Sequence, residues 1–421
     1  MLPKRDLSVF DSLYGEMVFG GEIADLISRP LIQRLRRIRL SNIDSPSMPG
    51  IANVSRYEHS LGCAYLATHV GFYRPLPVGQ KVCFQAAALL HDSAITPFGH
   101  LAEEALGYVD AHFDHEAKWS VLLAGEDSTV GGVGLQLYYG HASGLSEWAL
   151  KTFGNESQAM LEGIVGAIKG NGKFGRCVAG DIDLDNLDNV TRIAFHMGLK
   201  NDPNLPISVA TRMRDVDERG HVIYSDDAED DIVEWLRIRD AVYSRLMLSE
   251  LDFCGKVMLL YASVKGFEAG VLSAQDWVLT DSQFLERLVA CNHKEIRETA
   301  LRWLMGKPWD LTQLFWMEGD APTFGELRRF SSVLTAELGQ PYFAYGIKDK
   351  RQRKLNVKFT SGRVATFGKE SHKWLLGAGS PRSVSNDDNV KIARLAGEFF
   401  GAGFAPVVGG RATSPSLFET A

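Results

Sequence analysis

The sequence predicts a mainly α fold with a smaller α+β region toward the C-terminus. Apolar residues recur at helical spacing through most of the first 305 positions. Strand-like alternation appears clearly only within residues 341–367. A length of 421 residues allows one large helical domain and a smaller one, so we expect a core over 1–265, a C-terminal region over 266–408 and a flexible tail over 409–421.

Composition is typical of a globular chain, with 45% apolar and 23% charged residues. The net charge of −7 argues against a general nucleic-acid coat but allows a local basic pocket. The five cysteines form no CxxC pair, which fits reduced thiols in a cytoplasm. No signal-peptide pattern and no apolar stretch of spanning length is present, so we expect a cytoplasmic protein without a membrane partner.

The N-terminal part begins with a turn and an extended segment over residues 11–22, followed by a helical pattern over 23–40. Leu31, Ile32, Leu35 and Ile38 form its apolar stripe. The same pattern carries an arginine-rich stretch over 33–39. These arginines form either a solvated face or a site for phosphate or a partner subunit.

Further helices are expected from apolar periodicity, and two hairpins from turn residues. Residues 125–143 are rich in glycine and predict a loop or a weak hairpin. The hairpins are expected near Gly220 and around Ser361-Gly362. The expected helices cover residues 56–70, a segment ending at 92, a segment opening at 100, then 145–169, 181–199, 228–262, 282–291 and 293–305.

His91 and Asp92 follow nine uncharged, mostly apolar residues at the end of a helix that should be buried nearly all round. Two polar groups in such a place are costly unless a partner satisfies them, and a metal ion satisfies both together. His59 and Asp185 also lie where helices begin. Two imidazoles and two carboxylates suit Mn, Mg, Fe, Co, Ni or Zn with open coordination positions. A thiolate zinc site and an HExxH protease are not indicated.

This order of residues, H…HD…D, resembles the HD-domain metal-dependent phosphohydrolases, and within them the deoxynucleoside triphosphate triphosphohydrolases. These include bacterial dGTPase-like enzymes and the vertebrate SAM-and-HD-domain dNTPase. The similar stretches cover roughly residues 11–260. They are 11–15 (family DPIHG), 33–36 (QRLR), 56–62 (RFEHSLG), 90–92 with 97–100 (HDLGHGPFSH), 115–116 (HE) and 183–188 (DVDRLD).

The resemblance implies an HD-domain helical bundle that hydrolyses nucleoside triphosphates to nucleoside and inorganic triphosphate. It implies a divalent metal ion on four ligands, His59, His91, Asp92 and Asp185. It also implies substrate contacts from Arg56, Arg239 and Tyr243, and catalytic roles for His100, His115 and Glu116.

Family enzymes are commonly homo-oligomers, often with a nucleotide activator between subunits. Residues 34–39 and the basic run 348–354 are candidates for that role. A part in nucleotide-pool control or antiphage defence follows only from the resemblance.

Several positions depart from the family pattern. Ile95 stands where the family has a histidine. The residues near the sugar also differ, which implies that sugar recognition has been rebuilt while metal and phosphate chemistry is retained. These positions are Leu40, Ser41, Asn186, Asn189 and Ile193.

Two other functions remain open. One keeps the site but changes the substrate, giving a nucleotidase, a phosphodiesterase or a single-stranded nucleic acid nuclease. The basic stretches favour nucleic acid, but they lack interleaved aromatic residues of the stacking kind. The other is a non-catalytic protein that senses nucleotide. Product analysis separates the three.

Overall fold

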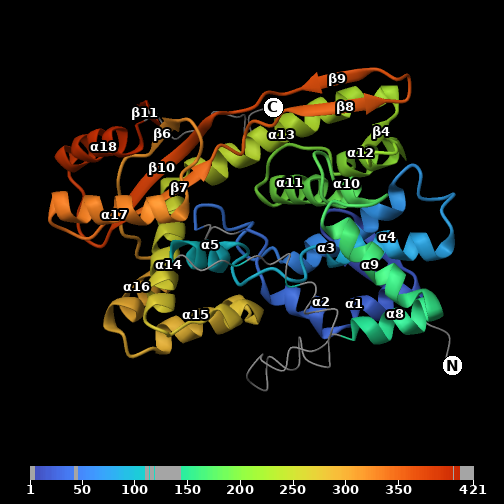
Figure 1. Cartoon of the computed structure of the whole chain (residues 1–421), viewed down its shortest axis with the longest axis horizontal. Helices are drawn as coiled ribbons and strands as arrows, with labels where there is room; N and C mark the ends of the chain where they lie inside the picture. The colour runs from blue at the N-terminus through green and yellow to red at the C-terminus, as the bar shows by residue number, and fades with distance from the viewer. Residues whose placement is uncertain are drawn as a thin grey trace.

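The computed structural model describes residues 5–41, 46–109, 113, 118, 144–401 and 403–407. Helices predominate, which confirms the mainly α class (Figure 1). Buried apolar side chains from the N-terminal hairpin to the last helix form one continuous core. The expected glycine-rich loop over 125–143 and the tail beyond 409 lie outside the described residues.

The chain opens with an antiparallel hairpin and short helices. They are β1 (Leu7–Asp11), β2 (Gly15–Phe19), α1 (Gly21–Ile27), α2 (Pro30–Arg34) and the 3-10 turn η1 (Leu35–Arg37). The single helix expected over 23–40 is wrong, because Pro30 cannot continue α1 and instead opens α2 as its first residue. The expected apolar stripe is nonetheless buried.

Arg34 does not have the role expected for the arginine-rich stretch. Its side chain is fully buried and donates to the carbonyl oxygens of Ile95, Trp277, Val278 and Leu279 at 2.8–3.0 Å. It therefore joins distant segments of the core and does not lie on a solvated face or bind an external phosphate.

The other arginines of this stretch differ among themselves. Arg36 and Arg37 are exposed, whereas Arg39 pairs with Asp281 at 3.3 Å. Only the two exposed side chains thus remain candidates for contacts with another subunit or an activator.

The helical core that follows carries the predicted ligands. In it α3 packs against α4 and α11, and α4 packs against α9. Its helices are α3 (Arg56–His69), α4 (Val78–Leu90), α5 (Leu101–Tyr108), α8 (Leu145–Phe153), α9 (Ser157–Ile168), α10 (Gly175–Val178), α11 (Leu184–His196) and α12 (Leu205–Arg212). The expected helix over 145–169 is two helices, because Gly154 adopts a positive φ of 57° between them.

The long helix expected over 228–262 is also two helices, α13 (Glu229–Leu248) and α14 (Glu250–Glu268). The break lies at Ser249, whose hydroxyl accepts from the backbone N–H of Asp252 and caps α14. Gly255 lies inside α14. The helices α15 (Asp281–Ala290) and α16 (Lys294–Leu304) match their predictions.

The C-terminal region contains more sheet than expected. Strand β10 (Lys373–Ser380) pairs antiparallel with β5 (Asp310–Leu311), β6 (Phe315–Glu318) and β7 (Phe343–Lys348), and β11 (Phe404–Pro406) extends β6. Helices α17 (Phe324–Leu338) and α18 (Asn386–Phe400) lie beside this sheet at one end of the molecule (Figure 1).

Both predicted hairpins are present. They are β3 (Met213–Val216) with β4 (Val222–Tyr224), and β8 (Leu355–Phe359) with β9 (Val364–Phe367), where Gly362 has a φ of 86°. Strands β4 and β8 pair in parallel, so the two hairpins form one four-stranded sheet. The pairing joins parts of the chain on either side of residue 265, and the division into domains stays a prediction.

Candidate active site

Four side chains from three separate stretches of the sequence converge at the ends of three helices. Nε2 of His59 lies 3.1 Å from Nε2 of His91, 3.1 Å from Oδ1 of Asp185 and 3.7 Å from Oδ2 of Asp92. Nε2 of His91 lies 3.5 Å from Asp92 and 3.8 Å from Asp185. The structure thus brings together all four predicted metal ligands.

These separations suit a shared cation. Atoms about 2.1 Å from one ion lie about 3 Å apart when they are neighbours in an octahedral arrangement. Two imidazole nitrogens and two carboxylate oxygens are a mixed donor set that divalent first-row metals accept. Without a cation, two carboxylates would share this space, which is unfavourable. The donor set and its spacing therefore fit the divalent metal that the resemblance implies.

The two histidines are oriented so that the same nitrogen of each faces the cluster. Nδ1 of His59 lies 2.7 Å from Oδ1 of Asp188, and Nδ1 of His91 lies 2.8 Å from the carbonyl oxygen of Ala88. Both oxygens only accept hydrogen bonds, so each Nδ1 carries the proton. Each Nε2 then keeps its lone pair for a metal, as is usual for metal-bound histidines.

Asp188 is held in place by a buried chain of charges. Arg192 binds both of its oxygens, at 2.9 and 3.0 Å, and also donates to Asp11 of β1 at 2.8 Å. Burial opposes ionisation of Asp188, but Arg192 and His59 hold its pKa at about 2. A Cβ on Gly62 would lie 2.0 Å from Asp188, so this close packing of α11 on α3 requires glycine.

Local sequence positions two of the ligands, His59 and Asp185. Ser55 and Glu58 form a capping box that starts α3, so that Arg56 and His59 lie in its first turn. Asp183 caps α11 by accepting from the backbone N–H of Asn186, which places Asp185 in the first turn of that helix.

Arg56 is buried and pairs directly with Asp92, while it also donates to the carbonyl oxygen of Leu40 at 3.2 Å. Burial raises the pKa of Asp92, but Arg56 and His91 outweigh it and hold that pKa below its usual value. Asp92 is therefore ionised and available as a ligand. Arg56 lies at the cluster, where the resemblance implies a phosphate contact.

Two further guanidinium groups meet beside Asp185. Arg239 of α13 and Arg353 each donate to Oδ1 of Asn186, at 3.3 and 3.2 Å. Arg353 also donates to the carbonyl oxygen of Gly180 at 2.9 Å. Burial and the nearby Arg353 lower the pKa of Arg239. Like charges held together in this way create a local site for an anion.

Arg353 was not assigned to the site from the sequence. It belongs to the basic run 348–354, and nothing in the sequence distinguishes it from its neighbours there. The arginines of this run differ in their partners, because Arg351 donates to the two carboxylate oxygens of Asp349 at 2.9 and 3.0 Å.

Tyr243 is half-buried, with its ring 4.5 Å from the guanidinium of Arg239.

Cys63 is a further possible ligand, since its sulfur forms a cluster with His59 and His91. It lies 3.7 and 3.8 Å from the two ring nitrogens of His59, and therefore above the ring and not in line with Nε2. Burial raises the pKa of the Cys63 thiol to about 12. Asp92 and Asp185 are better placed to complete the donor set.

The proposed proton-transfer residues are only partly described. His100 precedes α5, and its Nδ1 lies 3.0 Å from Glu103. His115 and Glu116 lie outside the described residues. Ile95, which stands in place of a family histidine, is fully buried.

Comparison with known proteins indicates a distant relationship to the HD-type deoxynucleoside triphosphate triphosphohydrolases. The chain is 25% identical to SAMHD1 of Bos taurus over 269 residues, which cover 56% of this chain and 43% of that protein. It is 35% identical to human SAMHD1 over 98 residues, or 22% of this chain and 16% of that protein.

A bacterial relative, the uncharacterized protein YwfO of Bacillus subtilis, is 28% identical over 183 residues, which cover 42% of this chain and 37% of YwfO. The chain thus spans less than half the length of each of these relatives. No protein-family model matches it. None of the described helices is both long and apolar enough to span a lipid bilayer.

Proposed function

We propose that this protein is a metal-dependent hydrolase that cleaves nucleoside triphosphates to nucleoside and inorganic triphosphate. The observation that carries the proposal is the convergence of two imidazoles and two carboxylates next to three arginines. The similarity to SAMHD1, which is named a deoxynucleoside triphosphate triphosphohydrolase, supports the same reaction.

His59, His91, Asp92 and Asp185 would hold the divalent ion. When bound, such an ion polarises a phosphoryl oxygen and lowers the pKa of water. Phosphoryl transfer otherwise depends on positioning and on positive charge around the transferred group. Arg56, Arg239 and Arg353 supply that charge from three separate segments of the chain.

Arg353 supplies a positive charge beside Asp185 that the residue directly after Asp185 does not supply. The family pattern has a basic residue directly after the metal-binding aspartate, whereas this chain has Asn186. Asn186 instead accepts from Arg239 and Arg353, and so holds two cations beside Asp185. We propose that both contact the phosphates of the substrate.

Proton transfer to the leaving oxygen is assigned to His100 or His115, with Glu116 nearby in the sequence. Imidazole has a pKa suited to this role near neutral pH. The side chain of His100 is 41% exposed, so it is accessible from solvent.

The sugar contact is proposed to involve Asn189, one helical turn after Asp185 and therefore on the same side of α11. Its side-chain oxygen is buried and accepts no hydrogen bond from the described residues. A sugar hydroxyl could donate to it. The family that the chain resembles has at this position a tyrosine that stacks under the sugar, so the contact differs here, and both ribo- and deoxyribonucleotides are candidate substrates.

The decisive experiment is a screen of all dNTPs and NTPs with Mn, Mg and Co, with inorganic triphosphate and nucleoside as the measured products. We expect triphosphate release that requires metal and disappears in His91→Ala/Asp92→Ala. Activity that survives this double substitution would rule out the proposed metal site.

The products also decide between the alternatives. Release of monophosphate or inorganic phosphate would indicate a nucleotidase, phosphodiesterase or nuclease. Tight nucleotide binding without turnover would indicate a sensing protein.

A second test concerns Arg353. Arg353→Gln should lower kcat/KM by about 10- to 100-fold, because a charge-assisted hydrogen bond contributes about 1.5–3 kcal/mol. Arg351→Gln is the matched control from the same segment. Its partner is Asp349, so we expect kcat/KM to change little. Equal effects of the two substitutions would contradict a phosphate contact by Arg353.

A further inference from the structure

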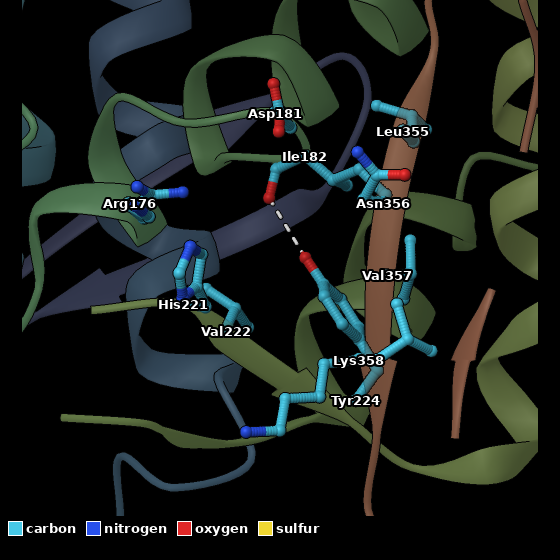
Figure 2. Close-up of a pocket in the computed structure, with 11 residues that line it drawn as sticks. Arg176, Asp181, Ile182, His221, Val222, Tyr224, Leu355, Asn356, Val357 and Lys358 are labelled. Atoms are coloured by element: carbon cyan, nitrogen blue, oxygen red, sulfur yellow. Dashed lines mark hydrogen bonds between the residues drawn. The ribbon is translucent and has the colours of Figure 1, made fainter. Parts of the chain in front are cut away.

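A cavity of about 290 Å³ lies where the two hairpins join, between strands β4 and β8 and residues 176–182. Figure 2 shows Arg176 and His221 on one side, with the β8 residues Leu355, Asn356 and Val357 opposite them. None of the four candidate metal ligands lines it. Its volume is close to the lower end of the range for small-molecule sites.

One part of the cavity is apolar. The ring of Tyr224 extends toward Ile182, and its hydroxyl donates to the Ile182 carbonyl oxygen at 3.0 Å (Figure 2). Leu355 and Val357 add buried aliphatic surface from β8. Val364, also in the lining, remains 64% exposed, so a bound molecule could cover it. These side chains suit a flat apolar body.

The basic side chains in the cavity, Arg176, His221 and Lys358, favour an anion, and the carboxylate of Asp181 in the lining lies 3.6 Å from Arg353. Arg176 is exposed and makes no ion pair or side-chain hydrogen bond with the described part of the chain. Asn356 accepts from Thr366 through its oxygen at 2.9 Å, which leaves its amide N–H groups as donors. Lys358 and His221 both pair with Asp217 at 3.3 Å. The cation that remains for a ligand is therefore Arg176.

We infer that this cavity is a second binding site, for a small organic anion with a planar apolar body. A carboxylate or phosphate group binds Arg176, and the body packs on Tyr224, Val357 and Val364. The amide of Asn356 donates a further hydrogen bond. This inference does not depend on the hydrolase reaction.

The site shares a segment with the candidate active site. Asp181 and Ile182 line the cavity, while Arg353 donates to the carbonyl oxygen of Gly180 and lies 3.6 Å from Asp181. A ligand in the cavity would therefore touch the turn that also holds Arg353.

The test is calorimetric titration of the full chain, without added metal, with phenyl phosphate, benzoate and phenol as probes. We expect at least one of the two anions to bind, and phenol to bind about 10-fold more weakly or not at all, because it lacks the charge. Comparison of phenyl phosphate with benzoate distinguishes phosphate from carboxylate recognition.

Variants then locate the binding. Arg176→Gln should raise the Kd of the anionic probe that binds by about 10-fold, because a charge-assisted hydrogen bond is lost. Asn356→Leu should also raise this Kd. Arg394→Gln, an exposed arginine on α18, should leave Kd unchanged. Thermal unfolding of each variant checks that the fold is retained.

Three results would overturn the inference. The first is no saturable binding of either anion at millimolar concentration. The second is an unchanged Kd in Arg176→Gln. The third is a Kd that rises in Arg353→Gln but not in Arg176→Gln, which would place the anion at the candidate active site.

Discussion

At the scale of single residues, the geometry of the candidate site depends on groups that are not themselves predicted ligands. Asp188 sets the tautomer of His59, Arg192 fixes Asp188, and Asp11 fixes Arg192. Asp11 and residues 183–188 belong to stretches that resemble the family pattern. The contact of Asp11 with Arg192 could not be predicted from the sequence, because 181 positions separate the two residues.

Asp188→Asn tests this chain of contacts. The substitution keeps the shape of the side chain but lets an amide N–H face Nδ1 of His59, which would move the ring proton to Nε2. We expect affinity for Mn or Co to fall about 10- to 100-fold, as is usual when a partner of a metal-binding histidine is lost. Calorimetric metal titration measures it.

The matched control is Asp231→Asn, since Asp231 pairs with Arg212 at 2.7 Å. It should leave metal affinity unchanged. If the two substitutions weaken metal binding equally, the effect is general destabilisation and the role given to Asp188 is wrong.

At the scale of helices and strands, the sequence predicted that the helices carrying the site exist, but it did not predict where the longer helical patterns divide. Periodicity indicated helices over 23–40 and 228–262, but it did not show that Pro30 and Ser249 divide them. The start of α3 at Arg56 agrees with the expected helix over 56–70, and Ser55 and Glu58 form the capping box at that start. A cap satisfies backbone N–H groups locally, but Ser249 caps α14 inside a continuous apolar pattern, and for that reason the division was not predicted.

Ser55→Ala should lower the free energy of unfolding by about 1 kcal/mol, the usual cost of losing an N-cap. It should also reduce nucleotide hydrolysis, because fraying of α3 moves Arg56 and His59. Thr323→Ala removes the same type of capping box from α17 and is the control. We expect a similar stability loss without the loss of activity, as measured by urea unfolding and triphosphate release.

At the scale of the whole molecule, long-range contacts connect the helical core to the C-terminal sheet. Lys256 of α14 is buried and lies 2.7 Å from Glu104 of α5, and its ammonium group is 5.7 Å from the ring centre of Tyr345 in β7. Burial lowers the pKa of Lys256, and Glu104 partly compensates. Through the ion pair and the contact with the Tyr345 ring, Lys256 joins three elements that are far apart in sequence.

Lys256→Met should therefore destabilise the protein by about 3–5 kcal/mol, because it leaves the Glu104 carboxylate without its buried partner. The double substitution Lys256→Met/Glu104→Gln should recover much of that loss, since a buried ion pair is often replaceable by neutral groups. Urea unfolding measures both. A double variant as unstable as the single one would show that the pair itself, and not the unpaired charge, stabilises the fold.

The sequence by itself predicted the mainly α class, the two hairpins and the candidate ligands His59, His91, Asp92 and Asp185, because each prediction depends on local periodicity, turn residues or an ordered series of motifs. Only the tertiary structure decided that Arg34 is a buried link and that Arg353 reaches Asn186. Both are arginines in basic runs, and which of them is buried depends on contacts with residues more than 60 positions away. The local sequence pattern does not predict such contacts.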